Sequence, residues 1–122
     1  MNVKELINLY ENIDKVSITD FYSVHVMYCK IVYTKPNLQD YNLEDIKNYC
    51  KFVYLFKESK KMKSELEKLT SYGKNLELLP ALNIVENIFE KSYEEVNRLS
   101  EAINCYEQKV EPIKDGIEDL FE

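Results

Sequence analysis

The stretch from Leu82 to Leu120, LNIVENIFEKSYEEVNRLSEAINCYEQKVEPIKDGIEDL, decides how this chain folds. Alternating steps of three and four residues from Leu82 select apolar side chains with a single exception, Ser92. The selected positions are Leu82, Val85, Phe89, Ser92, Val96, Leu99, Ile103, Tyr106, Val110, Ile113, Ile117 and Leu120. Because a 3.5-residue apolar period is the pattern of a coiled-coil seam, the stretch predicts one long helix over residues 80–121.

The segment before this stretch carries a matching pattern. Asn42 is a favourable N-cap and Gly73 a favourable C-terminal glycine, so a second long helix is predicted over residues 43–72. The same steps select Phe52, Leu55, Ser59, Met62, Leu66 and Leu69. Because the linker GKNLELLP is short, the two helices are expected to form an antiparallel hairpin.

The two seams favour one register. If Leu69 faces Leu82, the serines Ser59 and Ser92 meet each other, and the remaining seam residues pair apolar with apolar. Those pairs are Leu66 with Val85, Met62 with Phe89, Leu55 with Val96, and Phe52 with Leu99. In this register the first helix begins near Leu43, opposite about residue 108, so Pro112 lies just beyond the paired region. This predicts a kink at Pro112 and an apolar tail after it. The tail is expected to contact either the N-terminal segment or another chain.

The first 35 residues predict two shorter helices. One apolar face consists of Val3, Leu6, Ile7, Tyr10 and Ile13, and the other of Phe21, Val24, Tyr28, Ile31 and Val32. Ser17 and Asp20 resemble the capping start of the second helix. The segment VHVMYCKIVYT also has the composition of a strand, but no partner strand is visible, which favours a helix. Both helices are expected to dock where Tyr49, Phe56 and Tyr93 widen the hairpin's apolar surface.

The predicted fold is therefore all-α. It is a single domain over residues 1–122 with an elongated four-helix architecture: two short N-terminal helices packed on a long, coiled-coil-like antiparallel hairpin, with a kinked C-terminal helix. A chain of 122 residues with 45% hydrophobic residues and a net charge of -6 fits one globular, acidic domain.

The N-terminus, the lack of a long apolar run and the cysteines suggest a cytoplasmic protein. The charged N-terminus has no signal-peptide pattern, and no apolar run reaches membrane-spanning length. Cys29, Cys50 and Cys105 lack CxxC spacing, so they are interpreted as reduced thiols that act as small buried hydrophobes. The abundance of Lys, Asn, Ile and Tyr is typical of an AT-rich genome, such as that of a bacterium or phage.

No motif in the chain predicts catalysis, a metal site or a cofactor. His25 is the sole histidine and lacks the partners of a triad, and the two glycines are too few for a phosphate-binding loop. Asp115 and Glu118 have the spacing of a carboxylate magnesium site, but a solvated helix face is favoured there. One arginine and a pI near 4.9 argue against direct nucleic-acid contact. The basic patch around Lys63 is interpreted as a solvated face, with Lys63 within reach of Glu86.

Charge is distributed unevenly along the chain. Residues 1–74 hold 12 basic and 10 acidic residues, whereas residues 75–122 hold 4 basic and 12 acidic residues. The outward positions of the last long helix carry acidic residues that are expected to form an acidic ridge: Glu90, Glu94, Glu101, Glu111, Asp115 and Glu118. A solubility face explains this ridge, and so does a surface that complements a basic protein, for example by blocking a nucleic-acid-binding groove.

The functional hypothesis is a non-enzymatic protein–protein interaction module, a small acidic regulator or inhibitor. Its partner is expected to be a protein with a basic surface, and the apolar tail could also form a homodimer. The predicted partner-binding residues are Glu90, Glu94, Glu101, Glu111, Ile113, Ile117, Leu120 and Phe121. Two alternatives stay open: a small helical subunit of a larger, possibly nucleoprotein, complex, and a small carboxylate and magnesium-dependent helical enzyme.

Overall fold

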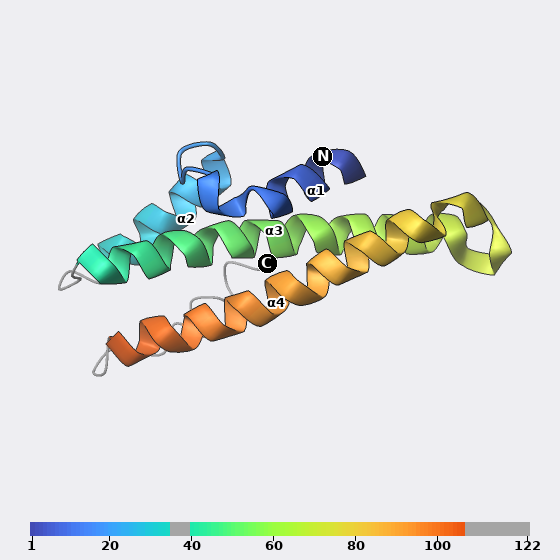
Figure 1. Ribbon diagram of the computed structural model, residues 1–122. Helices are drawn as coiled ribbons and strands as arrows, with labels where there is room; N and C mark the ends of the chain where they lie inside the picture. The colour runs from blue at the N-terminus through green and yellow to red at the C-terminus, as the bar shows by residue number, and fades with distance from the viewer. Residues whose placement is uncertain (35–39, 107–122) are drawn as a thin grey trace.

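In a computed structural model of the protein, the described residues are 1–34 and 40–106, with side chains described for 1–34 and 43–103. Every regular element within these ranges is helical, which confirms the all-α prediction. The elements are α1 (Val3–Glu11), η1 (Ile13–Lys15), α2 (Tyr22–Tyr33), α3 (Asp40–Thr70), η2 (Ser71–Gly73), η3 (Leu76–Leu78) and α4 (Leu79–Tyr106). The long helices α3 and α4 run side by side in opposite directions, and α1 and α2 lie along α3 (Figure 1).

Helix α1 begins and ends on asparagine side chains. Asn2 is the N-cap, and its side-chain oxygen accepts a hydrogen bond of 2.8 Å from the backbone N–H of Glu5. At the other end Asn12 donates to the carbonyl of Asn8 through both its backbone N–H and its side-chain amide. These bonds satisfy backbone groups that a helix of nine residues would otherwise leave open at its ends.

The segment after α1 is attached to α3 by a buried lysine. Lys51 is only 7% exposed, and its ammonium donates a 3.4 Å hydrogen bond to the carbonyl of Ile13 in η1. Ile13 itself is buried, so η1 contributes an apolar side chain and a carbonyl acceptor to the same contact. The link fixes where the chain leaves α1 before it turns into α2.

Ser17 and Asp20 do not cap the start of α2, so that prediction was wrong. The Asp20 carboxylate accepts the Ser17 backbone N–H at 2.8 Å, and the Asp20 N–H donates to the Ser17 carbonyl, so the pair closes a turn. Helix α2 starts only at Tyr22, after Phe21, whose side chain makes no capping hydrogen bond. The polar pair was a sound turn signal, because Ser and Asp side chains bond to nearby backbone in turns as well as at helix ends.

The bounds of α3 also differ from the prediction. Asp40 begins the helix, so Asn42 lies inside it and is not its N-cap. At the other end the backbone reverses through left-handed conformations, with φ of 59° at Tyr72, 72° at Gly73 and 51° at Asn75. Gly73 therefore takes the conformation expected of a glycine that ends a helix, three residues beyond the last α-helical residue, Thr70.

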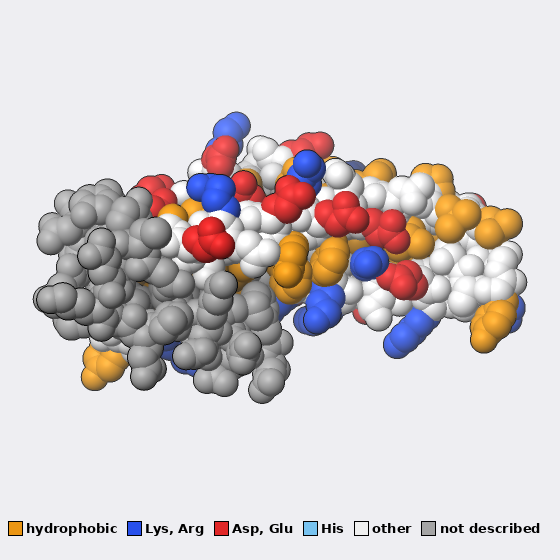
Figure 2. Space-filling view, turned by 90° about the horizontal axis from the view of Figure 1, so that it is seen from below, with side chains coloured by type: hydrophobic (Ala, Val, Ile, Leu, Met, Phe, Trp, Pro, Cys, Tyr) orange, Lys and Arg blue, Asp and Glu red, His pale blue; other side chains and the backbone are white. Residues whose placement is uncertain are grey.

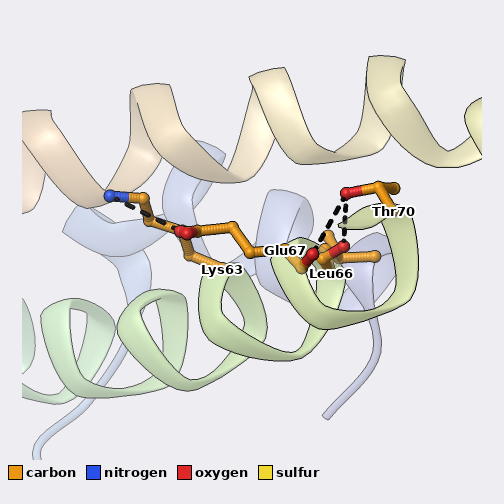
Figure 3. A network of polar contacts seen from close by, with 4 residues as sticks. All are labelled: Lys63, Leu66, Glu67 and Thr70. Atoms are coloured by element: carbon orange, nitrogen blue, oxygen red, sulfur yellow. Dashed lines mark hydrogen bonds and ion pairs between the residues drawn. The ribbon is translucent and has the colours of Figure 1, made fainter. Parts of the chain in front are cut away.

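Side chains in the last turns of α3 satisfy its terminal carbonyls. The Thr70 hydroxyl donates to the Leu66 carbonyl at 2.8 Å, next to an ion pair between Lys63 and Glu67 (Figure 3). The Asn75 side-chain amide reaches back to the Leu69 carbonyl at 2.7 Å. This last bond crosses from the linker to the helix, so it holds the reversal of the chain in place.

The core consists of two apolar clusters, one for each N-terminal helix. One joins α2 to the first half of α3 and the second half of α4, and its buried members are Val24, Met27, Ile31, Ile46, Tyr49, Cys50, Val53, Phe56, Val96, Leu99 and Ile103. The other joins α1 and η1 to the opposite halves, and its buried members are Leu6, Leu9, Ile13, Leu55, Met62, Leu66, Leu82, Val85 and Ile88. Tyr49 and Phe56 are buried as predicted for the docking surface, whereas Tyr93 is 52% exposed.

Phe89 of α4 contacts two side chains of α3. Its ring stacks on Phe56 with centroids 5.0 Å apart, and the Lys63 ammonium lies 4.8 Å from its centroid. Lys63 forms its ion pair with Glu67 of its own helix, at 3.8 Å, and not with Glu86 as expected. These contacts place the middle of α3 beside the middle of α4; the individual residue pairs of the register stay predictions.

The seam serines are buried and satisfied. Ser59 and Ser92 are both 0% exposed, and each hydroxyl donates a 3.0 Å bond to the carbonyl three residues earlier in its own helix. Leu69 departs from the predicted seam, because it is 49% exposed although Leu82 is buried. It lies in the last turn of α3, where the two helices separate into the linker.

None of the helices in the described ranges combines the length and the apolar character needed to cross a membrane.

Two leucines that the sequence places equally in the seam should respond differently to truncation. Leu99→Ala is expected to lower the free energy of unfolding by about 2–5 kcal/mol, because Leu99 is 1% exposed and its loss leaves a cavity. Leu69→Ala, the matched control, should cost less than about 1 kcal/mol because half of that side chain already meets solvent. Urea unfolding followed by circular dichroism measures both, and equal losses would contradict the described packing.

Candidate functional site

Three residues of the predicted acidic ridge lie on α4, on the side of the helix opposite its buried seam. Glu90, Glu94 and Glu101 are all exposed. At 100° per residue they fall within about 40° of one another and about 150° from the seam. The same pattern that buries Val85 and Val96 therefore directs these carboxylates to solvent.

The three ridge carboxylates carry unneutralised charge. Within the described residues the ion pairs are Glu58–Lys61, Lys63–Glu67 and Glu95–Arg98, each inside one helix, and none includes a ridge glutamate. Arg98 is held by Glu95 at 2.7 Å, and this hydrogen bond raises the pKa of its guanidinium above the ordinary value. The arginine of α4 is therefore already engaged by the carboxylate beside the ridge.

A view of this side of the molecule shows the extent of the charge. Carboxylate side chains gather in a band along the described part of the surface, with lysine and arginine side chains scattered between them (Figure 2). Glutamates four residues apart on one face repel each other, so Glu90 and Glu94 slightly destabilise the helix that carries them. A cationic surface brought against the ridge would relieve that repulsion.

The other predicted partner-binding residues lie outside the described residues. They are Glu111, Ile113, Ile117, Leu120 and Phe121, and the predicted kink at Pro112 and the acidic pair Asp115 and Glu118 fall in the same part of the chain. The apolar tail thus stays a prediction.

Sequence reasoning missed an apolar surface at the linker between α3 and α4. Leu69, Tyr72, Leu76 and Leu79 are 49%, 98%, 55% and 40% exposed, and we call these four residues the tip patch. Apolar side chains gather at the corresponding end of the molecule in Figure 2. Tyr72 also adopts a left-handed backbone, which is unusual for a bulky residue. The sequence signal for this surface was the linker GKNLELLP, whose three leucines occupy no seam position.

Two buried groups of α3, Cys50 and Tyr49, have pKa values raised by burial. Burial raises the pKa of the Cys50 thiol from 9.0 to about 12, with a smaller contribution from Cys29, so the reactive thiolate is suppressed. Burial also raises the pKa of Tyr49. The hydroxyls of Tyr49 and Ser100 are buried without a hydrogen-bond partner in the described part of the chain. The structure confirms the prediction of a buried hydrophobe for Cys50.

Cys29 contradicts the same prediction. It is exposed on α2, and its sulfur lies 3.7 Å from Nε2 of the exposed His25 one turn earlier. Sequence reasoning noted only that His25 lacks the partners of a triad, and it missed this pair. The four-residue spacing between His25 and Cys29 was the signal that could have found it. Cys105 lies outside the residues with described side chains.

No complete metal site is present in the described ranges, because they contain no group of three or more His, Cys, Asp or Glu side chains able to share an ion. A hollow of about 380 Å³ lies beside α1, lined mainly by Leu9, Val16 and Phe21 and bordered by Glu5 and Asp20. The Asp20 carboxylate at its border is already used by the Ser17 turn.

Comparison with known proteins identifies no relative: no family model, curated protein or solved structure matches this chain.

The free energy of unfolding is expected to fall at alkaline pH because Cys50 and Tyr49 are buried in their protonated forms. In the folded protein the pKa of Cys50 is raised to about 12, whereas in the unfolded chain it takes its ordinary value of 9.0. Unfolding is therefore favoured as pH rises above 9.0, by up to about 1.4 kcal/mol per pH unit for each such group. Below 9.0 this contribution is fully present.

Urea unfolding from neutral pH to about pH 10.5 measures the loss. Cys50→Ala should flatten the slope just above pH 9.0, and Tyr49→Phe should flatten it above 10.0, the ordinary tyrosine value. A slope unchanged in both variants would show that other groups control the alkaline transition.

Proposed function

We propose that this protein is a non-enzymatic protein–protein interaction module, a small acidic helical regulator or inhibitor. The observation that carries the proposal is the ridge itself: three exposed glutamates on one face of α4, none of them in an ion pair within the described residues. A protein with a basic surface is the partner that this chemistry fits. A nucleic-acid-binding groove is one such surface, and the ridge would block it electrostatically.

The scaffold supports this use of the ridge. We propose that α3 and α4 form a coiled-coil-like hairpin, stiff enough to present Glu90 and Glu101 at a fixed separation of about 16 Å. The backbone of a packed helix loses little freedom on binding, so more of the electrostatic attraction is retained as affinity. Helix α3 packs against the opposite face of α4, which leaves the ridge face available to another molecule.

Apolar contacts would supply the remaining affinity. Exposed charge pairs contribute mainly to the rate and specificity of association, and fully buried apolar side chains contribute more to its strength. The tip patch offers three leucines and Tyr72 for this purpose. The predicted tail, with Glu111, Ile113, Ile117, Leu120 and Phe121, offers a second apolar contact or a homodimer contact.

Two other functions compete with this proposal. A small subunit of a larger, possibly nucleoprotein, complex would use the same ridge and patch against a permanent partner. A carboxylate and magnesium-dependent enzyme would need acids converging in one place, whereas Glu90, Glu94 and Glu101 point to solvent. The geometry of the described residues favours the interaction module over the enzyme.

Reversing the ridge charge should disrupt partner binding. Capture from source-cell extract with the tagged protein is expected to retain a basic partner at low salt and to release it at high salt. The triple variant Glu90→Lys, Glu94→Lys, Glu101→Lys should weaken that complex at least about tenfold, since three exposed pairs contribute about 0.5 kcal/mol each.

A matched control makes the same change in net charge away from the ridge. Glu11→Lys, Asp14→Lys and Glu65→Lys alter three exposed acids on α1, η1 and α3 and should leave the complex intact. Partner binding that survives ridge reversal, or that both triple variants weaken equally, would count against the ridge as the binding surface.

Removing the tail tests the second proposed contact. A chain that ends at Lys109 is expected to keep its helical circular dichroism and its melting temperature, because both described core clusters lie before that point. With a metal chelator present, it should lose any self-association that the full chain shows in sedimentation. A large drop in melting temperature would show instead that the tail belongs to the core.

A further inference from the structure

His25 and Cys29 present two metal-ligand atoms side by side on the surface of α2. Both residues are exposed, and Nε2 of His25 lies 3.7 Å from Sγ of Cys29. A tetrahedral zinc ion sits about 2.0–2.1 Å from imidazole nitrogen and about 2.3 Å from thiolate sulfur, which places those two ligands about 3.6 Å apart. The separation of the pair therefore already matches the span of two ligands around one zinc ion.

The pair is only half of a zinc site. Within the described residues no third His, Cys, Asp or Glu joins it to complete a group that could hold a metal. Structural zinc sites bind the ion with four protein ligands, and two Cys with two His is one of the common sets. One chain supplies one ligand of each kind here, so two chains supply that set.

The surroundings of the pair are suited to a second copy of the same helix. Tyr22 and Tyr33 are 84% and 88% exposed, and they flank the pair on the same face of α2. The pair is centred near residue 27, with Tyr22 about 7.5 Å before this level and Tyr33 about 9 Å after it along the helix. An antiparallel crossing about this level would bring each Tyr22 near the Tyr33 of the other copy.

We propose that two copies of the chain bind one zinc ion between their α2 helices, with His25 and Cys29 of each copy as the four ligands. The symmetry is that of a two-fold dimer, in which the same surface of each copy meets itself. Each thiol releases its proton to solvent when its sulfur binds the metal, so binding weakens as pH falls. Thiolate and imidazole ligands suit zinc better than magnesium or calcium, which prefer oxygen.

This site is separate from the ridge on α4. Its residues belong to α2, and none of them takes part in the proposed binding of a basic partner. The zinc-linked dimer and the interaction module can therefore be tested and rejected independently of each other.

The test uses the purified, reduced, metal-free full chain. Zinc titration followed by sedimentation should double the mass, with the change complete at one zinc ion per two chains, and a chelator should reverse it. Substituting Co²⁺ should give the intense visible bands of a tetrahedral site and the charge-transfer band of a thiolate ligand.

Variants separate this site from other metal binding. His25→Ala and Cys29→Ser should each abolish the doubling and the cobalt spectrum, and both should fold normally because the residues are exposed. Cys105→Ser, which also removes one thiol, is the matched control and should change neither. Circular dichroism verifies that each variant is folded.

Several outcomes would overturn the proposal. They are zinc bound with no change in mass, a doubling that persists in His25→Ala or depends on a disulfide, loss of the effect in Cys105→Ser, and no zinc binding at all.

Discussion

Burial of the faces that α3 and α4 turn to each other is the interaction on which the rest of the structure depends. Neither α1, with nine residues, nor α2, with 12, is long enough to be stable as an isolated helix in water. Each is held by an apolar cluster that draws side chains from both long helices. The cluster under α2 includes Leu99 of α4, so a cavity in the seam also weakens the surface on which α2 packs.

The sequence predicted the parts of the fold that repeat. Seven apolar residues at regular spacing between Leu82 and Tyr106 identify α4 and its buried side, because every turn adds the same evidence. Helix ends depend instead on a few local bonds, and there the prediction failed: Asn42 lies inside α3, and Ser17 with Asp20 closes a turn. Leu69 fits the seam pattern but is exposed, because periodicity alone does not indicate where two helices diverge.

The candidate sites could be predicted from the sequence only in part. The positions of Glu90, Glu94 and Glu101 follow from the seam, since a residue half a turn away from a buried stripe must face solvent. The exposed tip patch could not be predicted in this way, because it depends on left-handed backbone at Tyr72 and Asn75 that breaks the helical period. His25 and Cys29 were visible as a spacing, but their exposure depends on which side of α2 packs against α3.

The packing of α2 and of α4 determines which side chains each helix exposes. Val24, Met27 and Ile31 occupy one side of that helix and are buried against α3 and α4, so His25 and Cys29 are left on another side, exposed. In the same way α4 buries Val96 and Leu99 and exposes Glu90, Glu94 and Glu101. The two surfaces are chemically different, because one carries a thiol and an imidazole group and the other carries carboxylates. The two proposed contacts would not compete with each other, because neither uses side chains that the other needs.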